Sequence, residues 1–108
     1  MKLRGILETN RKGWSFMNLI DVTNSYADLV HSQLNTTAVN YVKVYSLGNT
    51  TVVYTESPIA IGIVLENHHR KVREEELEFV IKRLIPDRGS YQLTVDQTRH
   101  VVEIHVDK

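Results

Sequence analysis

The stretch from Asn40 to Ser57, NYVKVYSLGNTTVVYTES, is the part of the chain that decides its fold. Two runs rich in valine, tyrosine and threonine, residues 41–45 and 51–55, flank the turn pair Gly48-Asn49. Such β-forming runs around a short glycine-containing turn predict a β-hairpin. The other segments are placed relative to this hairpin.

A two-residue turn also sets the register of the hairpin, with Lys43 opposite Tyr54. Because side chains alternate between the faces of a strand, the predicted hairpin has two unlike faces. One face carries Tyr41, Lys43, Tyr45, Tyr54 and Glu56, and the other carries Val42, Val44 and Val53. The tyrosine-bearing face is a candidate surface for protein contact. The alternative is that its tyrosines are core residues whose hydroxyls reach the sheet edge.

The rest of the chain predicts a repeated arrangement of one helix and several strands. In order we expect a strand at 19–22, a helix at 25–35, the hairpin, a buried central strand at 59–65 and a helix beginning near Arg73. A second hairpin follows with its turn at Gln97-Thr98, which places Leu93 opposite Val102. The order β-α-β-β-β-α-β-β predicts an α+β two-layer sandwich, with a mostly antiparallel sheet and both helices on one face.

The chain has 108 residues and no cysteine. This length predicts one domain, large enough to bury a hydrophobic core without disulfides or metals. The absence of cysteine excludes thiolate catalysis and is compatible with a reducing cytosol. No apolar run approaches the roughly 20 residues that a membrane-spanning helix needs, so we expect no membrane association and a cytoplasmic location.

The first 16 residues differ from the rest of the chain. They hold four of the 13 basic residues and only one of the 13 acidic residues. We expect residues 1–16 to be a flexible or non-native extension, with synthesis starting at Met17, and residues 17–108 to form the single α+β domain. The alternative is an ordered arm that packs Trp14 and Phe16 on the domain. The mildly acidic remainder disfavours nucleic acid as a partner.

The densest basic segment lies between the central strand and the second helix and contains His68, His69, Arg70, Lys71 and Arg73. These residues are candidates for binding an anion or nucleic acid, together with the free backbone N–H groups of the helix. The alternative is a solvated junction, because the three glutamates that follow would repel an anion. Adjacent histidines in an extended chain point in opposite directions, so we expect no metal site.

Phe79 is an anomaly on the second helix. The apolar stripe of that helix consists of Leu77, Val80, Ile81, Leu84 and Ile85. On a helical wheel Phe79 lies opposite this stripe, grouped with Val72, Lys82 and Arg83. An aromatic anchor ringed by charged side chains suits a homodimer or another protein contact, although single exposed aromatic residues are also ordinary.

No segment has the pattern of a catalytic or cofactor site. The serines lie outside any nucleophile-elbow sequence, and no glycine-rich phosphate-binding loop occurs. His100, on the apolar face expected for the second hairpin, is interpreted as a core histidine rather than a base. We therefore predict no catalytic residue, no metal ligand and no cofactor.

The runs Val22–Val30 and Val44–Thr55 together resemble a family of small proteins from lactic acid bacteria and their relatives, the domain of unknown function 1827. The resemblance covers roughly residues 17–84 and is strongest in the hairpin. It implies a cytosolic bacterial protein. Members of the family begin near the position of Met17. It implies no catalytic residues.

The functional prediction is therefore a small cytosolic protein-interaction or regulatory module without a catalytic site, acting on another protein or on itself as a homodimer. The alternative is a weak nucleic-acid-binding module that uses the tyrosine-bearing face with Arg70, Lys71 and Arg73. The identity of a ligand or partner, the oligomeric state and the strand order do not follow from the sequence.

Overall fold

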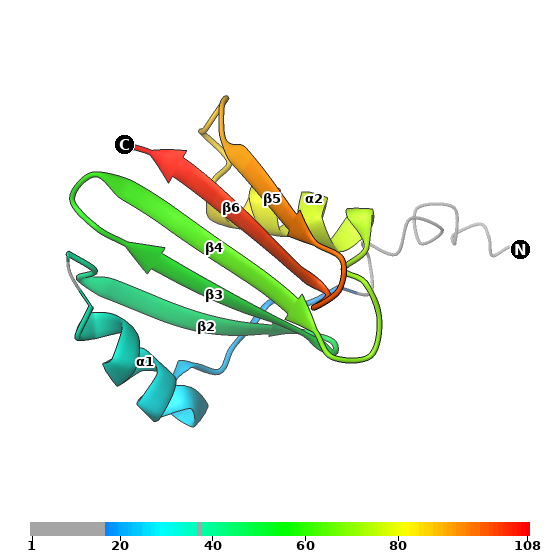
Figure 1. Ribbon diagram of the computed structural model, residues 1–108, viewed down its shortest axis with the longest axis horizontal. Coiled ribbons are helices and arrows are strands. Elements are labelled where there is room, and N and C mark those ends of the chain that lie inside the picture. The colour runs from blue at the N-terminus through cyan, green and yellow to red at the C-terminus, as the bar shows by residue number, and fades with distance from the viewer. Residues whose placement is uncertain (1–16, 37) are drawn as a thin grey trace, which may run out of the picture.

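The computed structural model describes residues 17–36 and 38–108, which form one six-stranded sheet with two α-helices (Figure 1). The strands are β1 (Ile20–Asp21), β2 (Tyr41–Leu47), β3 (Thr50–Glu56), β4 (Ala60–Asn67), β5 (Gln92–Asp96) and β6 (Val101–Asp107). The helical segments are the 3₁₀ turn η3 (Thr23–Tyr26), α1 (Ala27–Leu34) and α2 (Glu74–Leu84). The expectation about residues 1–16 lies outside the described residues.

The sheet is antiparallel throughout, with the strand order β1-β2-β3-β4-β6-β5. The predicted α+β class and order of elements are confirmed. So is the register of the first hairpin, in which Lys43 pairs with Tyr54. Gly48 has a φ of 60°, a left-handed conformation that this turn requires and that glycine adopts without steric cost.

The main hydrophobic core lies between α2 and one face of the sheet. Its strand residues alternate along β3, β4 and β6, and Val80 and Ile85 close it from the helix side. On the opposite face of β4, residues such as Gly62 and Val64 are half-buried. The continuous apolar run at residues 59–65 predicts a strand buried on both faces. This prediction is wrong, because α2 covers only one of them.

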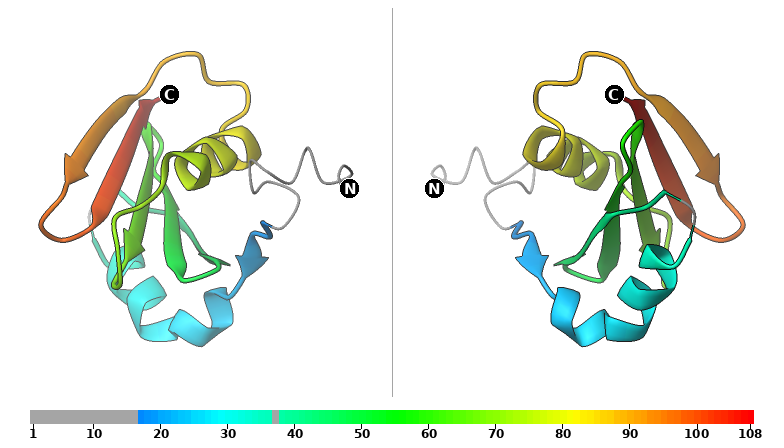
Figure 2. Two further views of the ribbon diagram at one scale, coloured as in Figure 1. Left: turned by 90° about the vertical axis from the view of Figure 1, so that its right-hand side faces the viewer. Right: turned by 90° about the vertical axis from the view of Figure 1, so that its left-hand side faces the viewer.

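The two helices lie on opposite faces of the sheet, so the prediction of both helices on one face is wrong. Val42 and Val44 are buried, yet alternation along β2 points them away from the α2 core. α1 contacts β2 and lies at that end of the sheet, away from α2 (Figure 2). The alternation in the hairpin shows that both faces need cover but does not assign a helix to either.

The second hairpin has a different register from the one predicted. Leu93 pairs with Ile104 and Val95 with Val102, which shifts the pairing by two residues. The turn therefore spans residues 97–100, and the Asp96 carboxylate accepts the Arg99 backbone N–H at 3.1 Å. Such a bond favours the longer turn. A shift of two residues keeps every side chain on its face, but it moves His100 from the apolar face into the turn, where its φ is 57°.

We expect the substitution Ile63→Ala to lower the free energy of unfolding by about 2–5 kcal/mol. The reason is that Ile63 is fully buried in the centre of the α2 core, so truncation leaves a cavity. Urea unfolding measures the loss. The matched control is Ile59→Ala, because Ile59 is 74% exposed, and equal effects of the two substitutions would contradict this account of the core.

Candidate functional site

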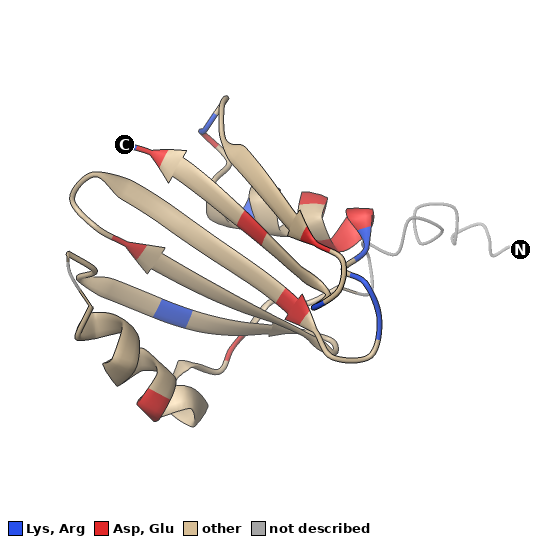
Figure 3. Ribbon diagram, in the orientation of Figure 1, with Lys and Arg blue, Asp and Glu red and all other residues tan. Residues whose placement is uncertain are grey.

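The basic segment at residues 68–73 forms the loop between β4 and α2 (Figure 3). Beneath this loop lie three polar residues that are at most 5% exposed, Thr50, Asn67 and Glu76. Buried polar groups are costly unless they are hydrogen-bonded. The partners of these three residues therefore determine the shape of the loop and the availability of its charges.

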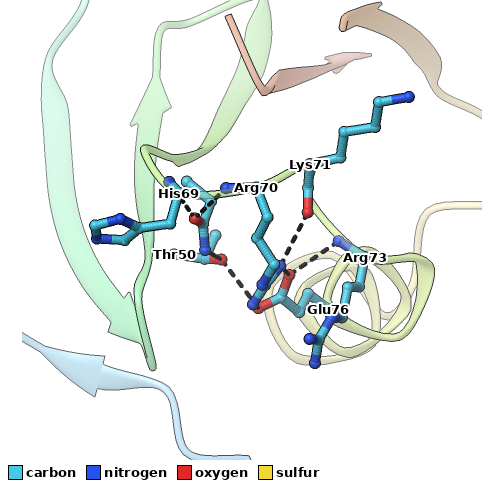
Figure 4. A network of polar contacts seen from close by, with 7 residues as sticks. Thr50, His69, Arg70, Lys71, Arg73 and Glu76 are labelled. Carbon is cyan, nitrogen blue, oxygen red and sulfur yellow. Dashed lines mark hydrogen bonds and ion pairs between the residues drawn. The ribbon is translucent and has the colours of Figure 1, made fainter.

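The carboxylate of Glu76, in the first turn of α2, accepts four hydrogen bonds (Figure 4). Arg70 donates two of them, from Nη1 to Oε1 and from Nη2 to Oε2, each at 2.9 Å. The Arg73 backbone N–H and the Thr50 hydroxyl donate the others, also at 2.9 Å. Because Arg73 is the N-cap of α2, Glu76 joins the helix start to the loop and to the first hairpin.

Asn67, at the end of β4, completes this network from the other side. Its Nδ2 donates to Thr50 Oγ1 at 3.0 Å. Its Oδ1 accepts the backbone N–H groups of His69 at 2.8 Å and Arg70 at 3.1 Å. Arg70 Nη1 also donates to the Lys71 carbonyl at 2.9 Å. The loop backbone is thus held at several points, by the buried side chains of Asn67 and Glu76 and by the partly exposed side chain of Arg70.

Burial opposes the charge on Glu76, but the hydrogen bonds from Arg70, the Arg73 N–H and Thr50 outweigh it. They lower the pKa of Glu76 below its ordinary value of 4.5. The ion pair is therefore formed at neutral pH. The sequence reading missed this partner of Arg70, although Arg73 and Glu76 have the three-residue spacing of a capping box.

The predicted basic candidates share one loop but have different environments. The Arg70 guanidinium is engaged by Glu76. The side chains of His68, His69, Lys71 and Arg73 are exposed, and His68 Nδ1 lies 4.0 Å from a Glu66 carboxylate oxygen. The charge of Arg70 is therefore paired within the protein, which makes this loop less suited to holding an anion.

The tyrosine-bearing face of the first hairpin lies on the same side of the sheet as α2. Tyr54 belongs to the core, and its hydroxyl donates to Glu56 at 2.6 Å. The ring of Tyr41 meets that of Tyr54 edge-on at 6.0 Å, and Tyr45 is half-buried against the core. These contacts match the alternative of core tyrosines for Tyr54 and, in part, for Tyr45, whereas Tyr41 is 44% exposed.

A cleft of about 500 Å³ opens beside this face and is lined by residues that include Tyr54, Glu56, Ile61, Ile85 and Arg88. The Glu56 carboxylate in this cleft is already bonded, because it also accepts a hydrogen bond from Lys108 Nζ at 2.9 Å. The Tyr54 hydroxyl and Lys108 lower the pKa of Glu56. Burial and the Glu56 carboxylate raise the pKa of Tyr54 above its usual range. Neither group is poised for acid–base chemistry near neutral pH.

Phe79 is half-buried and packs against the core, so the prediction that it lies on the wet face of α2 is wrong. The Arg83 guanidinium lies over its ring, 5.4 Å from the centroid. Met17 and Leu19 pack against the same core. A helical wheel describes one helix alone, so it does not show that other segments cover its outer face. Val72 is half-buried against the core as well, whereas Lys82 is exposed.

An exposed apolar surface on the edge strand β5 was missed by the sequence reading. It consists of Tyr91, Leu93 and Val95, here called the β5 strip, with exposed fractions of 39%, 45% and 57%. Leu93 and Val95 share a face with their pairing partners Ile104 and Val102, which belong to the core. The strip therefore continues the core face beyond the cover of α2. The position of β5 at the sheet edge is what distinguishes these residues from core residues.

The opposite edge of the sheet is protected. The Asp21 carboxylate accepts the Thr23 N–H at 2.9 Å, the Thr23 hydroxyl at 2.6 Å and Lys43 Nζ at 3.2 Å. These bonds lower the pKa of Asp21 from 3.8 to about 2. Thr23 Oγ1 in turn accepts the Val44 backbone N–H at 3.0 Å. Charged groups and side chains bonded to the backbone are common protection for an edge, and β5 itself carries one charged residue, Asp96, at its end.

We expect Glu76→Gln to destabilise the protein by about 3 kcal/mol at neutral pH, because it leaves Arg70 without its charged partner. Urea unfolding measures the change. The matched control is Glu75→Gln on the same helix, where the side chain is exposed and the expected change is within about 0.5 kcal/mol. A loss in Glu76→Gln no larger than in the control would contradict the structural role of the network.

The stability difference between wild type and Glu76→Gln is expected to depend on pH. Since folding lowers the pKa of Glu76, the carboxylate stabilises the fold fully above its unfolded value of about 4.5 and loses this effect as pH falls through the folded value. Urea unfolding from neutral pH down to about pH 3 should show the difference shrinking below about pH 4.5. A difference that grew on acidification would refute the assignment.

Comparison with known proteins agrees with this geometry. The family described as domain of unknown function DUF1827 matches residues 17–107. A conserved protein of unknown function from Streptococcus thermophilus LMG 18311 has a similar solved structure, with a TM-score of 0.75 and 29% sequence identity. The match covers 85% of this chain and 97% of that one.

No curated protein matches the chain. Among the helices of the described residues, none has the length and apolar character needed to span a membrane. The family match extends over most of the chain and includes the first hairpin, α2 and the edge strand β5. The chain belongs to the DUF1827 family.

Proposed function

We propose that this protein is a non-catalytic interaction module that works by protein contact through the β5 strip. The observation that carries the proposal is an edge strand with exposed apolar side chains and, among the described residues, no protecting contact, on a sheet whose other edge is protected. We place the module in the cytoplasm, which the absence of cysteine supports.

An edge strand offers a partner two kinds of contact. Its outer row of backbone N–H and C=O groups can pair with another strand, and alternate side chains supply specificity. In β5 these side chains are Leu93 and Val95, whose burial would be favourable in any protein interface. The strip is small, so it suits a regulated or modest contact rather than a large permanent one.

Two of the features on which nucleic-acid binding would depend are engaged within the protein, whereas Tyr41, Lys71 and Arg73 are exposed. Tyr54 is packed in the core, which leaves little of its ring for stacking on a base. Arg70 is paired with Glu76. In Figure 3 the lysines and arginines lie at separate places, including β2 and the loop before α2, whereas phosphate backbones are bound by basic patches or stripes.

Photo-crosslinking from two equally exposed positions tests the proposal. A photoreactive amino acid replaces Val95 in one variant and Ile20 in the other, each of which is 57% exposed and lies in an edge strand. In the native cell we expect protein adducts from position 95 and far fewer from position 20, because the β1 edge is protected and the β5 edge is open to pairing.

Adding Leu93→Asp to the position-95 variant is expected to remove these adducts, since the charge would be desolvated in the interface. Equal adduct yields from the two positions, or adducts that a nuclease removes, would contradict protein contact through β5.

A further inference from the structure

We infer that the partner of β5 is a second copy of this chain, paired antiparallel, β5 to β5, about a two-fold axis at Thr94. The inference rests on the proposed function and names its partner. The starting observation is the sequence of β5, Gln92-Leu93-Thr94-Val95-Asp96. It reads polar, apolar, polar, apolar, polar in both directions from Thr94.

This symmetry is what pairing with a second copy requires. A contact about a two-fold axis uses the same surface on both copies, so each residue pair occurs twice, once in each direction. With the axis at Thr94, Leu93 lies opposite Val95 of the second copy, and Val95 lies opposite its Leu93. Two apolar cross-strand pairs form, and the exposed Leu93 and Val95 side chains of both copies are covered together.

The charges of β5 are compatible with this register. Asp96 is the charged residue of the strand, and with the axis at Thr94 it lies opposite the uncharged Gln92 of the second copy. Its carboxylate is also held by Arg99, which lies 3.9 Å away. An axis at Asp96 would set two carboxylates opposite each other, which is destabilising. An axis at Gln92 would set Val95 opposite Gly89, which has no side chain to cover it.

A cleft next to β5 provides space for the second copy. It has a volume of about 220 Å³, and its lining includes Val72, Val95 and Val102. Val95 and Val102 are directly paired across β5 and β6, so this cleft lies on the face that carries the β5 strip. Leu93 of the second copy would lie beside Val95 on that face and cover the apolar side of the cleft. The sheets of the two copies would become one continuous sheet.

The test uses a pair of complementary charged variants of the full chain. Leu93→Glu and Val95→Lys are each expected to weaken self-association at least about tenfold, because each sets a charge opposite an apolar side chain. Mixed together they are expected to form a one-to-one heterodimer. In that heterodimer the introduced glutamate of one variant lies opposite the introduced lysine of the other, and the second cross-strand pair keeps its native Val95 and Leu93.

Sedimentation equilibrium and native mass spectrometry measure the association, with wild type studied up to about 100 µM. Urea unfolding of each variant checks that the fold is retained. Ile20→Lys on the protected edge is the control, and it should associate as wild type does. Support requires a wild-type dimer, weakened association of each variant alone and a heterodimer in the mixture that high salt weakens.

A wild type that stays monomeric, or a dimer that both variants leave unchanged, would overturn pairing with a second copy. A mixture that does not associate would overturn the axis at Thr94. Crosslinks from position 95 to a different protein, together with a monomeric wild type, would leave the proposed function standing and refute only this inference. No protein crosslinks from position 95 would refute both.

Discussion

The register of β2 against β3 is the constraint on which the rest of the structure depends. It sends Val52 and Tyr54 to the α2 side and Val42 and Val44 to the other side. Both sides then carry enough apolar surface to require cover, since exposed side chains of this kind forgo the gain from burial. One helix on each face is the arrangement that covers both.

The buried network of Glu76 connects this hairpin to α2. Thr50 comes from the start of β3, Asn67 from the end of β4, and Arg70 from the loop that leads to the helix. The hydrogen bonds to the carboxylate offset the cost of its burial. They also tie the start of α2 to the sheet. The same network engages the arginine that would otherwise make this loop attractive to anions.

The two edges of the sheet differ in a way that bears on function. At the β1 edge, the side chains of Asp21 and Thr23 accept hydrogen bonds from neighbouring backbone N–H groups, and Asp21 also accepts one from Lys43. At the β5 edge, Leu93 and Val95 are exposed beside a backbone row that pairs with no further strand of the described residues. Edges without protection invite pairing with another strand. In the proposed function, association is therefore directed to the β5 edge.

Local patterns in the sequence were sufficient for the elements and for much of the pairing. Alternation and the Gly48-Asn49 turn predicted the first hairpin with its register, and the apolar stripe predicted α2. The second hairpin was misplaced by two residues, because an Asp96 side-chain bond lengthened its turn. The family resemblance also came from these local patterns.

What only the tertiary structure decided concerns contacts between segments far apart in the sequence. The face covered by each helix, the burial of Phe79 and the pairing of Arg70 with Glu76 all depend on which surfaces meet. The β5 strip is the same kind of case, because Leu93 and Val95 have the alternation of core residues and are exposed only because β5 ends the sheet. Periodicity reports which side of an element is apolar, whereas strand order and helix placement determine what, if anything, covers it.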